Sequence, residues 1–190
     1  MKKVVLFTSG IDVITALLED FYATDSTYYL LFIDSTADKF ENRLDVLKLY
    51  NIIEKILKDR LNDFVIEKDT FEYKLTKGKP SKFIWLNLYA SAIRLTLEQG
   101  CKEIICGALS GDGQKEELFH NTFKKFSLEI YGININTPFI GSDSNKSKVL
   151  KTMLRLLNSH SGDANVASLK EVLSEKYDFS TFETEVQNIT

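Results

Sequence analysis

Thr8, Ser9, Gly10 and Asp12 stand together between an apolar run and a helical pattern near the start of the chain. Small residues let backbone amides approach an anion closely, and the positive end of a following helix supports bound phosphate. The two hydroxyls add donors, and Asp12 can offset the helix dipole or hold Mg²⁺ beside a phosphate. The pattern fits a phosphate-binding turn, and it also fits a plain strand-to-helix connection that holds no ligand.

Short apolar runs alternate with helical patterns on both sides of this turn. We expect strands at residues 4–7, 28–33, 64–66, 103–109 and 133–140. We expect helices at residues 11–22, 40–58, 84–98, 115–131, 146–158 and 167–177. Continuous apolar runs such as "YYLLFI" are typical of strands that are buried on both faces. Gly100 and Gly132 are placed to end two of the helices.

Strict alternation of strand and helix predicts parallel strands joined by right-handed crossovers. The expected fold is a three-layer α/β/α sandwich around a doubly wound, five-stranded parallel sheet in the order 3-2-1-4-5. Ligands of such sheets bind beyond the carboxyl ends of the strands, where the chain order reverses. Asp34 and Gly107 should reach the same edge as Thr8–Gly10. We expect residues 1–160 to form the domain that carries this edge, with residues 161–190 as a polar, helical extension packed on it.

The composition is that of an ordinary globular protein, because 44% of the 190 residues are hydrophobic and 27% are charged. A net charge of −3 argues against a protein that coats nucleic acid. Met1-Lys2-Lys3 precedes only four apolar residues, too few for a signal peptide or a membrane span. Cys101 and Cys106 are the only cysteines, which suits neither a disulfide framework nor a zinc site. A cytoplasmic protein without zinc is the expectation.

Six residues, Thr8 to Val13, resemble a degraded form of the pyrophosphate-loop signature of the ATP-pyrophosphatases, serine-glycine-glycine-apolar-aspartate-serine. Other motifs resemble one branch of these PP-loop enzymes, the 7-cyano-7-deazaguanine synthases of queuosine biosynthesis. In that family an aspartate follows a glycine by five residues after the fourth strand, as Asp112 follows Gly107 in "GALSGD". A phenylalanine stands eleven residues further on, here Phe123.

Three more positions follow the same order along the chain. Pro80-Ser81-Lys82-Phe83 stands in place of the Pro-x-Arg-Asn element that opens the central helix of the family. Pro138-Phe139 and the stretch from Lys146 to Val149 match a proline near the end of the fifth strand and a lysine-led helix start. The resemblance covers about residues 3 to 157, and the order and spacing of the motifs carry it.

The resemblance implies an ATP-dependent C–N ligase. ATP, with Mg²⁺ near Asp12, would adenylate a small, deazapurine-like carboxylate that ammonia or an amine then attacks, with the adenine against the end of strand two and Gly107. The implied catalytic residues are Asp12, Lys82 and Asp112. The implied nucleotide-binding residues are Thr8, Ser9, Gly10, Asp12, Asp34, Gly107 and Lys146. The implied substrate-binding residues are Lys82, Asp112, Glu116 and His120.

The chain departs from the family at several of these positions. Val13 replaces a phosphate-facing serine, and Lys82 replaces an arginine and loses its bidentate fork. Residues 116–120 read Glu-Glu-Leu-Phe-His where the family has a Tyr-Pro-Asp-Cys-Arg substrate element, and the C-terminal zinc cysteines are absent. An altered substrate is therefore expected. The alternative is a degenerate relative that binds a nucleotide or a protein partner without turnover.

The remaining polar residues leave several alternatives open. His120 could act as an acid or base, but a solvated histidine on a helix is the stronger expectation. Asp34 could contact a ribose or Mg²⁺, or it could simply end a strand. There is no GxxxxGK[ST] motif, so an ordinary P-loop kinase is excluded. The partners expected are a nucleotide and a small molecule, without a membrane, and a homodimer or a protein partner stays open.

Overall fold

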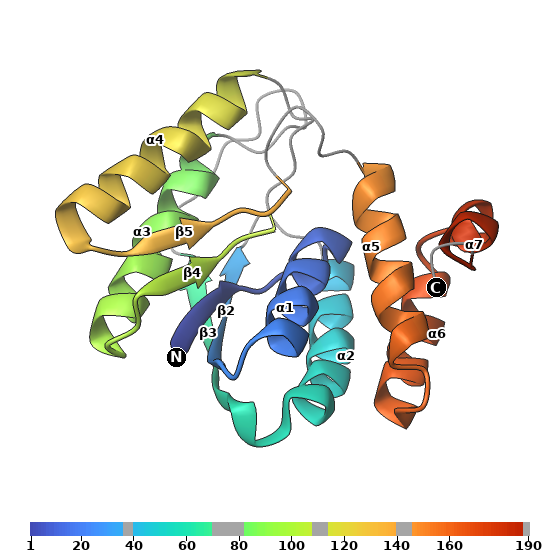
Figure 1. Ribbon diagram of the computed structural model, residues 1–190. Helices are drawn as coiled ribbons and strands as arrows, with labels where there is room; N and C mark the ends of the chain where they lie inside the picture. The colour runs from blue at the N-terminus through green and yellow to red at the C-terminus, as the bar shows by residue number, and fades with distance from the viewer. Residues whose placement is uncertain (36–39, 70–81, 108–113, 140–145, 188–190) are drawn as a thin grey trace.

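A five-stranded sheet forms the centre of the computed structural model, which describes residues 1–35, 40–69, 82–107, 114–139 and 146–187 (Figure 1). The strands stand in the order β3-β2-β1-β4-β5, and each neighbouring pair is parallel. Their bounds are β1 Lys2–Leu6, β2 Thr27–Ser35, β3 Leu61–Asp69, β4 Glu103–Ile105 and β5 Asn134–Asn136. The chain order reverses between β1 and β4, which puts the ligand-binding crevice of such a sheet at their carboxyl ends.

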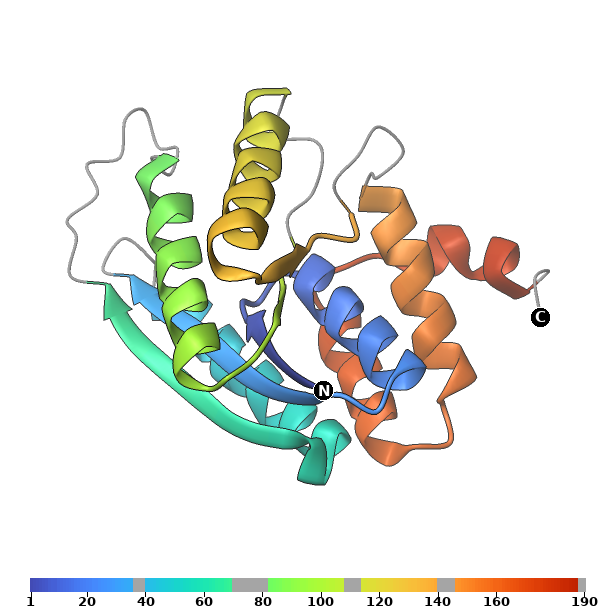
Figure 2. The ribbon, with the colours of Figure 1, turned by 60° about the vertical axis from the view of Figure 1, so that its left-hand side comes forward.

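Helices cover both faces of this sheet (Figures 1 and 2). Their bounds are α1 Ile11–Ala23, α2 Phe40–Leu57, α3 Lys82–Glu98, α4 Gln114–Tyr131, α5 Lys146–Ser159, α6 Ala164–Ser174 and α7 Ser180–Gln187, with a 3-10 turn at Lys58–Arg60. Helices α1, α2, α5 and α6 share one apolar core with the sheet, whereas α3 and α4 cover the opposite face. The expected three-layer sandwich and the expected strand order are confirmed.

The central strands are apolar on both faces because each face meets a layer of helices. Val5 and Leu30 belong to the core on the α1 side, while Val4 and Leu31 belong to the core on the α3 side. All four are at most 1% exposed. Successive side chains of a strand point to opposite faces, so burial on both sides produces the continuous apolar runs seen in the sequence.

Three strands differ most in length from the prediction. Strand β3 extends over Leu61–Asp69 instead of residues 64–66, because an edge strand pairs through its backbone and needs no apolar side chains at its ends. Strand β4 ends at Ile105 and strand β5 at Asn136, both earlier than predicted. Pro138 has no backbone amide to continue the ladder of β5. Leu109 and Ile140, the predicted ends of these strands, lie outside the described residues.

The end of the chain forms two helices where the sequence predicted one at residues 167–177. Asp163 accepts a hydrogen bond from the amide of Asn165 (2.8 Å) and so begins α6 earlier. Asp178 accepts from the amide and the hydroxyl of Ser180 at the start of α7, and these bonds lower the pKa of the Asp178 carboxyl. Helix α6 packs against α2, and α7 packs against α5.

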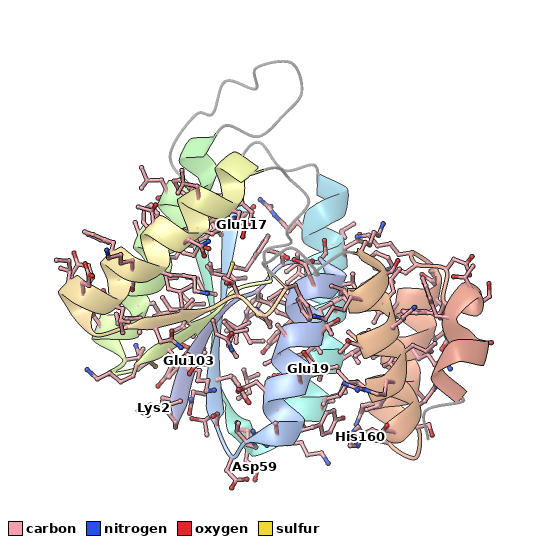
Figure 3. The ribbon with its side chains drawn as sticks, turned by 45° about the horizontal axis from the view of Figure 1, so that its top comes forward. Lys2, Glu19, Asp59, Glu103, Glu117 and His160 are labelled. Carbon is pink, nitrogen blue, oxygen red and sulfur yellow. The ribbon has the colours of Figure 1, made fainter. Side chains whose placement is uncertain are left out.

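A buried ion cluster joins the strands at the amino end of the sheet. Lys3, which is 4% exposed, places Nζ 2.7 Å from Oδ1 of Asp20 and 3.1 Å from Oε1 of Glu103. The Tyr28 hydroxyl donates to the other oxygen of Asp20 (2.8 Å). Burial is the main cause of the raised pKa of Tyr28, and this hydrogen bond is the second cause. Strands β1, β2 and β4 and helix α1 are thereby tied together. Glu103 lies at the end of the molecule opposite to Glu117 of α4 (Figure 3).

Replacing Lys3 by alanine should lower the free energy of unfolding by about 3 kcal/mol, because two largely buried carboxylates lose their counter-charge. Urea denaturation measures this change. Lys2→Ala is the matched control, since Lys2 is exposed and should change stability by no more than about 0.5 kcal/mol. Equal urea midpoints for the two variants would show that the cluster adds nothing to stability.

Candidate functional site

The turn between β1 and α1 lies at the carboxyl end of the central strand. Thr8 is exposed, and Ser9 and Gly10 are half-buried. Gly10 is extended (φ −73°, ψ 137°) and precedes the first helical residue without a side-chain cap of its own. The Gly10 amide donates to the hydroxyl of Thr8 (3.2 Å), so this hydroxyl supports the turn itself. The first turn of any α-helix leaves amides without intrahelical partners, which is the usual setting for an anion.

The Asp12 carboxylate folds back over Gly10. A methyl group on Gly10 would lie 2.4 Å from Oδ1 of Asp12 and 3.2 Å from the hydroxyl of Thr8. The carboxylate thus occupies the positive end of α1, where it offsets the helix dipole. A phosphate bound at the same place would be repelled by this carboxylate. A divalent cation between the two groups would remove the repulsion.

Gly107, just after β4, packs directly on the first turn of α1. A methyl group on Gly107 would lie 2.2 Å from the backbone nitrogen of Val13 and 2.5 Å from its Cα. The Val13 side chain is only 1% exposed and belongs to the core on the α1 side. A hydroxyl at this position would therefore sit against the core and the backbone of Gly107. The backbone after β4 and the backbone of the first turn of α1 are therefore in direct contact, with no space for a ligand between them.

Asp34 and Lys146 lie on two other elements at this end of the sheet. Asp34, in β2, forms an ion pair with Arg43 of α2 (2.5 Å). Lys146 begins α5, and its Nζ lies 5.7 Å from the centre of the Tyr177 ring, a cation–π contact with the segment that follows α6. Each of these charges already has a protein partner, which a nucleotide would have to replace or share.

The other predicted site residues are only partly described. Lys82 is the first residue of α3, and Glu116 lies in the first turn of α4. The side chains of both fall outside the described part of the chain, and so does Asp112 altogether. Their proposed contacts with a substrate stay predictions.

His120 is buried, so the expectation of a solvated histidine was wrong. Its side chain is 3% exposed, and Nδ1 lies 2.6 Å from the hydroxyl of Tyr89. The same hydroxyl is 3.7 Å from Sγ of Cys106, and burial is the main cause of the raised pKa of Tyr89. Trp85 packs edge-on against the imidazole, with ring centres 4.8 Å apart. His120 thus joins α4 to α3 inside the molecule.

The sequence did not lead us to expect this aromatic cluster between α3 and α4. Phe123, singled out by the resemblance, stacks on Tyr89 with ring centres 5.2 Å apart, and Phe119 packs beside both. A signal was present, because residues 85 and 89 are four apart on one helix, as are 119 and 123 on the next. Only the packing of the two helices shows that the four rings meet.

Within the described part of the chain, no group of three or more His, Cys, Asp and Glu side chains could hold a metal ion. No helix found there is long and apolar enough to cross a membrane. A Mg²⁺ ion that arrives with a nucleotide needs only one or two carboxylates besides phosphate oxygens. Asp12 carries a carboxylate in the first turn of α1.

The fold and the turn together define a doubly wound, parallel α/β protein with its crevice at the carboxyl ends of β1 and β4. The sequence matches no protein-family model and no curated protein. PH1313 from Pyrococcus horikoshii Ot3 is similar in structure at a TM-score of 0.49 and 12% identity, over 82% of this chain and 40% of that protein. The U34-tRNA thiolase NcsA from Methanococcus maripaludis, solved with its [4Fe-4S] cluster, is similar at a TM-score of 0.45 and 18% identity. That match covers all of this chain and 64% of NcsA. This chain therefore spans less than two thirds of either protein.

Replacing Gly107 by alanine should destabilise the protein by about 1–3 kcal/mol, because the new methyl group meets backbone atoms that cannot turn aside. Chemical denaturation is the measurement. Gly162→Ala is the control, since a methyl group there meets nothing within 4 Å. Should Gly107→Ala be as stable as the control, the contact between β4 and α1 is looser than described.

Proposed function

We propose that this chain binds ATP or AMP at the turn between β1 and α1 and activates a small carboxylic acid as its adenylate. The observation that carries the proposal is the turn itself, with Thr8, Ser9 and Gly10 ahead of α1 at the point where the strand order reverses. The resemblance to PP-loop enzymes in the order of its motifs adds support.

The expected reaction is adenylation followed by displacement. A carboxylate oxygen of the acid bonds to the α-phosphorus of ATP as the bond to the β-phosphate breaks and pyrophosphate leaves. Ammonia or an amine then attacks the acyl carbon, and AMP departs with the electron pair of the broken C–O bond. The chain contributes position and charge stabilisation. When bound, Mg²⁺ neutralises phosphate charge, and Asp12 is the residue that would hold it.

A second candidate is a protein that binds a nucleotide or a partner without turnover. Two observations favour it. The position of the phosphate-facing serine is taken by the buried Val13, and the Thr8 hydroxyl is engaged with the Gly10 amide. Both reduce the number of donors left for a phosphate in the transition state.

The Asp12 carboxylate predicts how nucleotide binding depends on Mg²⁺. Wild-type protein should bind ATP at least tenfold more tightly with Mg²⁺ than with a chelator, because the ion neutralises the repulsion between Asp12 and the phosphates. Asp12→Asn should bind ATP in chelator more tightly than wild type and should lose most of the gain from Mg²⁺. Isothermal titration calorimetry measures both.

Asp59→Asn is the control for that experiment, because Asp59 is exposed at the opposite end of the molecule (Figure 3). It should bind ATP as wild type does under both conditions. If wild-type protein releases no heat at millimolar ATP with Mg²⁺, the nucleotide proposal fails and the partner-binding candidate gains.

The departures at Lys82 and at residues 116–120 predict an acid other than that of the synthases. With ATP, Mg²⁺ and ammonia, 7-carboxy-7-deazaguanine should give no nitrile by chromatography, while another acid should release AMP and pyrophosphate. Robust nitrile formation would show that the original specificity survives. ATP binding without AMP release, over a broad panel of acids, would favour the candidate without turnover.

A further inference from the structure

A cavity of about 280 Å³ opens between α2 and the end of α6, next to the candidate nucleotide turn. Ser9 lines it, so the cavity and the turn share a residue. The sequence gives no hint of this neighbourhood, because the cavity forms only where α6 packs against α2. One side of the cavity is formed by α2, and the other side is formed by the C-terminal segment that follows the five-stranded sheet.

The lining of the cavity is amphipathic. Leu49 of α2 and Leu173 of α6 provide an apolar floor and are 4% and 1% exposed. Asp45 and Lys176 lie at one side and neutralise each other, with Nζ 3.3 Å from Oδ2. This ion pair also fastens the end of α6 to α2.

Two further charges line the cavity, the ammonium of Lys48 and the carboxylate of Glu175. In the described part of the chain, neither side chain forms a hydrogen bond or an ion pair. A simple anion would gain one ammonium but would also face two carboxylates. An uncharged apolar molecule would leave both charges without a partner. A molecule with both charges and an apolar body satisfies the whole lining.

We propose that this cavity binds an α-amino acid with an apolar side chain. Its carboxylate pairs with Lys48 and accepts from the Ser9 hydroxyl, its ammonium pairs with Glu175, and its side chain lies on Leu49 and Leu173. The volume suits a small ligand of this size. The site rests on the proposed function in one respect: through Ser9 the amino acid carboxylate lies beside the nucleotide phosphates. The amino acid is then the acid whose oxygen bonds to the α-phosphorus as pyrophosphate leaves.

The test measures binding of L-leucine and L-phenylalanine to the full chain without nucleotide, by saturation-transfer NMR and calorimetry. At least one should bind, and N-acetyl-L-leucine and L-leucinamide, which each lack one charge, should bind at least tenfold more weakly than L-leucine. Lys48→Ala and Glu175→Gln should each weaken amino acid binding at least tenfold. Both residues are exposed, so both variants should keep the urea midpoint of wild type.

Lys55→Ala and Glu171→Gln are the matched controls. Lys55 lies about two turns further along α2 on the same face, Glu171 lies on α6, and neither lines the cavity. Both variants should bind as wild type does. The proposal is overturned if neither amino acid binds, if the singly charged analogues bind equally well, or if Lys48→Ala has no effect.

The outcome separates this site from the nucleotide proposal. Amino acid binding by a protein that binds no ATP would support the cavity and refute adenylation. ATP binding by a protein that ignores both amino acids would refute the cavity alone. If both ligands bind, release of AMP and pyrophosphate in their joint presence supports the combined reaction, and its absence refutes the transfer step.

Discussion

The backbone contact between Gly107 and Val13 is the constraint on which the candidate site depends. It brings the end of β4 against the first turn of α1 with no room for a side chain between them. The strand order of the sheet reverses between β1 and β4. The contact therefore lies at the floor of the crevice that doubly wound sheets use for ligands. The turn from Thr8 to Gly10 and the start of α1 lie directly beside this contact.

Charge at the two ends of the sheet is handled in different ways. At the amino end, Lys3 is enclosed by Asp20 and Glu103, and Arg60 donates to the carbonyls of Phe21, Thr24 and Ser26. These groups are satisfied within the protein and hold the strands in register. At the carboxyl end, Asp12 lies over the helix terminus that would receive a phosphate, and Lys48 and Glu175 line a cavity.

The face covered by α3 and α4 departs most from what the resemblance implies. His120, at a position matched to a substrate element, is held by Tyr89 and Trp85 inside the protein. Leu118 of the same element is 68% exposed and takes no part in that packing. The C-terminal helices instead build a wall on the opposite face of the sheet, where the cavity beside Ser9 lies.

Hydrophobic periodicity in the sequence determined the layers and the parallel strands, because burial on both faces makes a strand such as β2 apolar along its length. The order 3-2-1-4-5 was the arrangement expected for this alternation, and the structure confirms it. Periodicity also identified the turn from Thr8 to Asp12, since the carboxyl end of a central strand follows from that order. Contacts between distant segments could not be read in this way. His120 looks solvated in a helical pattern with polar neighbours, and only the approach of α3 to α4 buries it. Lys48 and Glu175 are more than a hundred residues apart, and only the packing of α6 on α2 brings them to one cavity. Periodicity reports the burial of apolar residues, whereas the burial and the partner of a polar group depend on distances that tertiary packing alone sets.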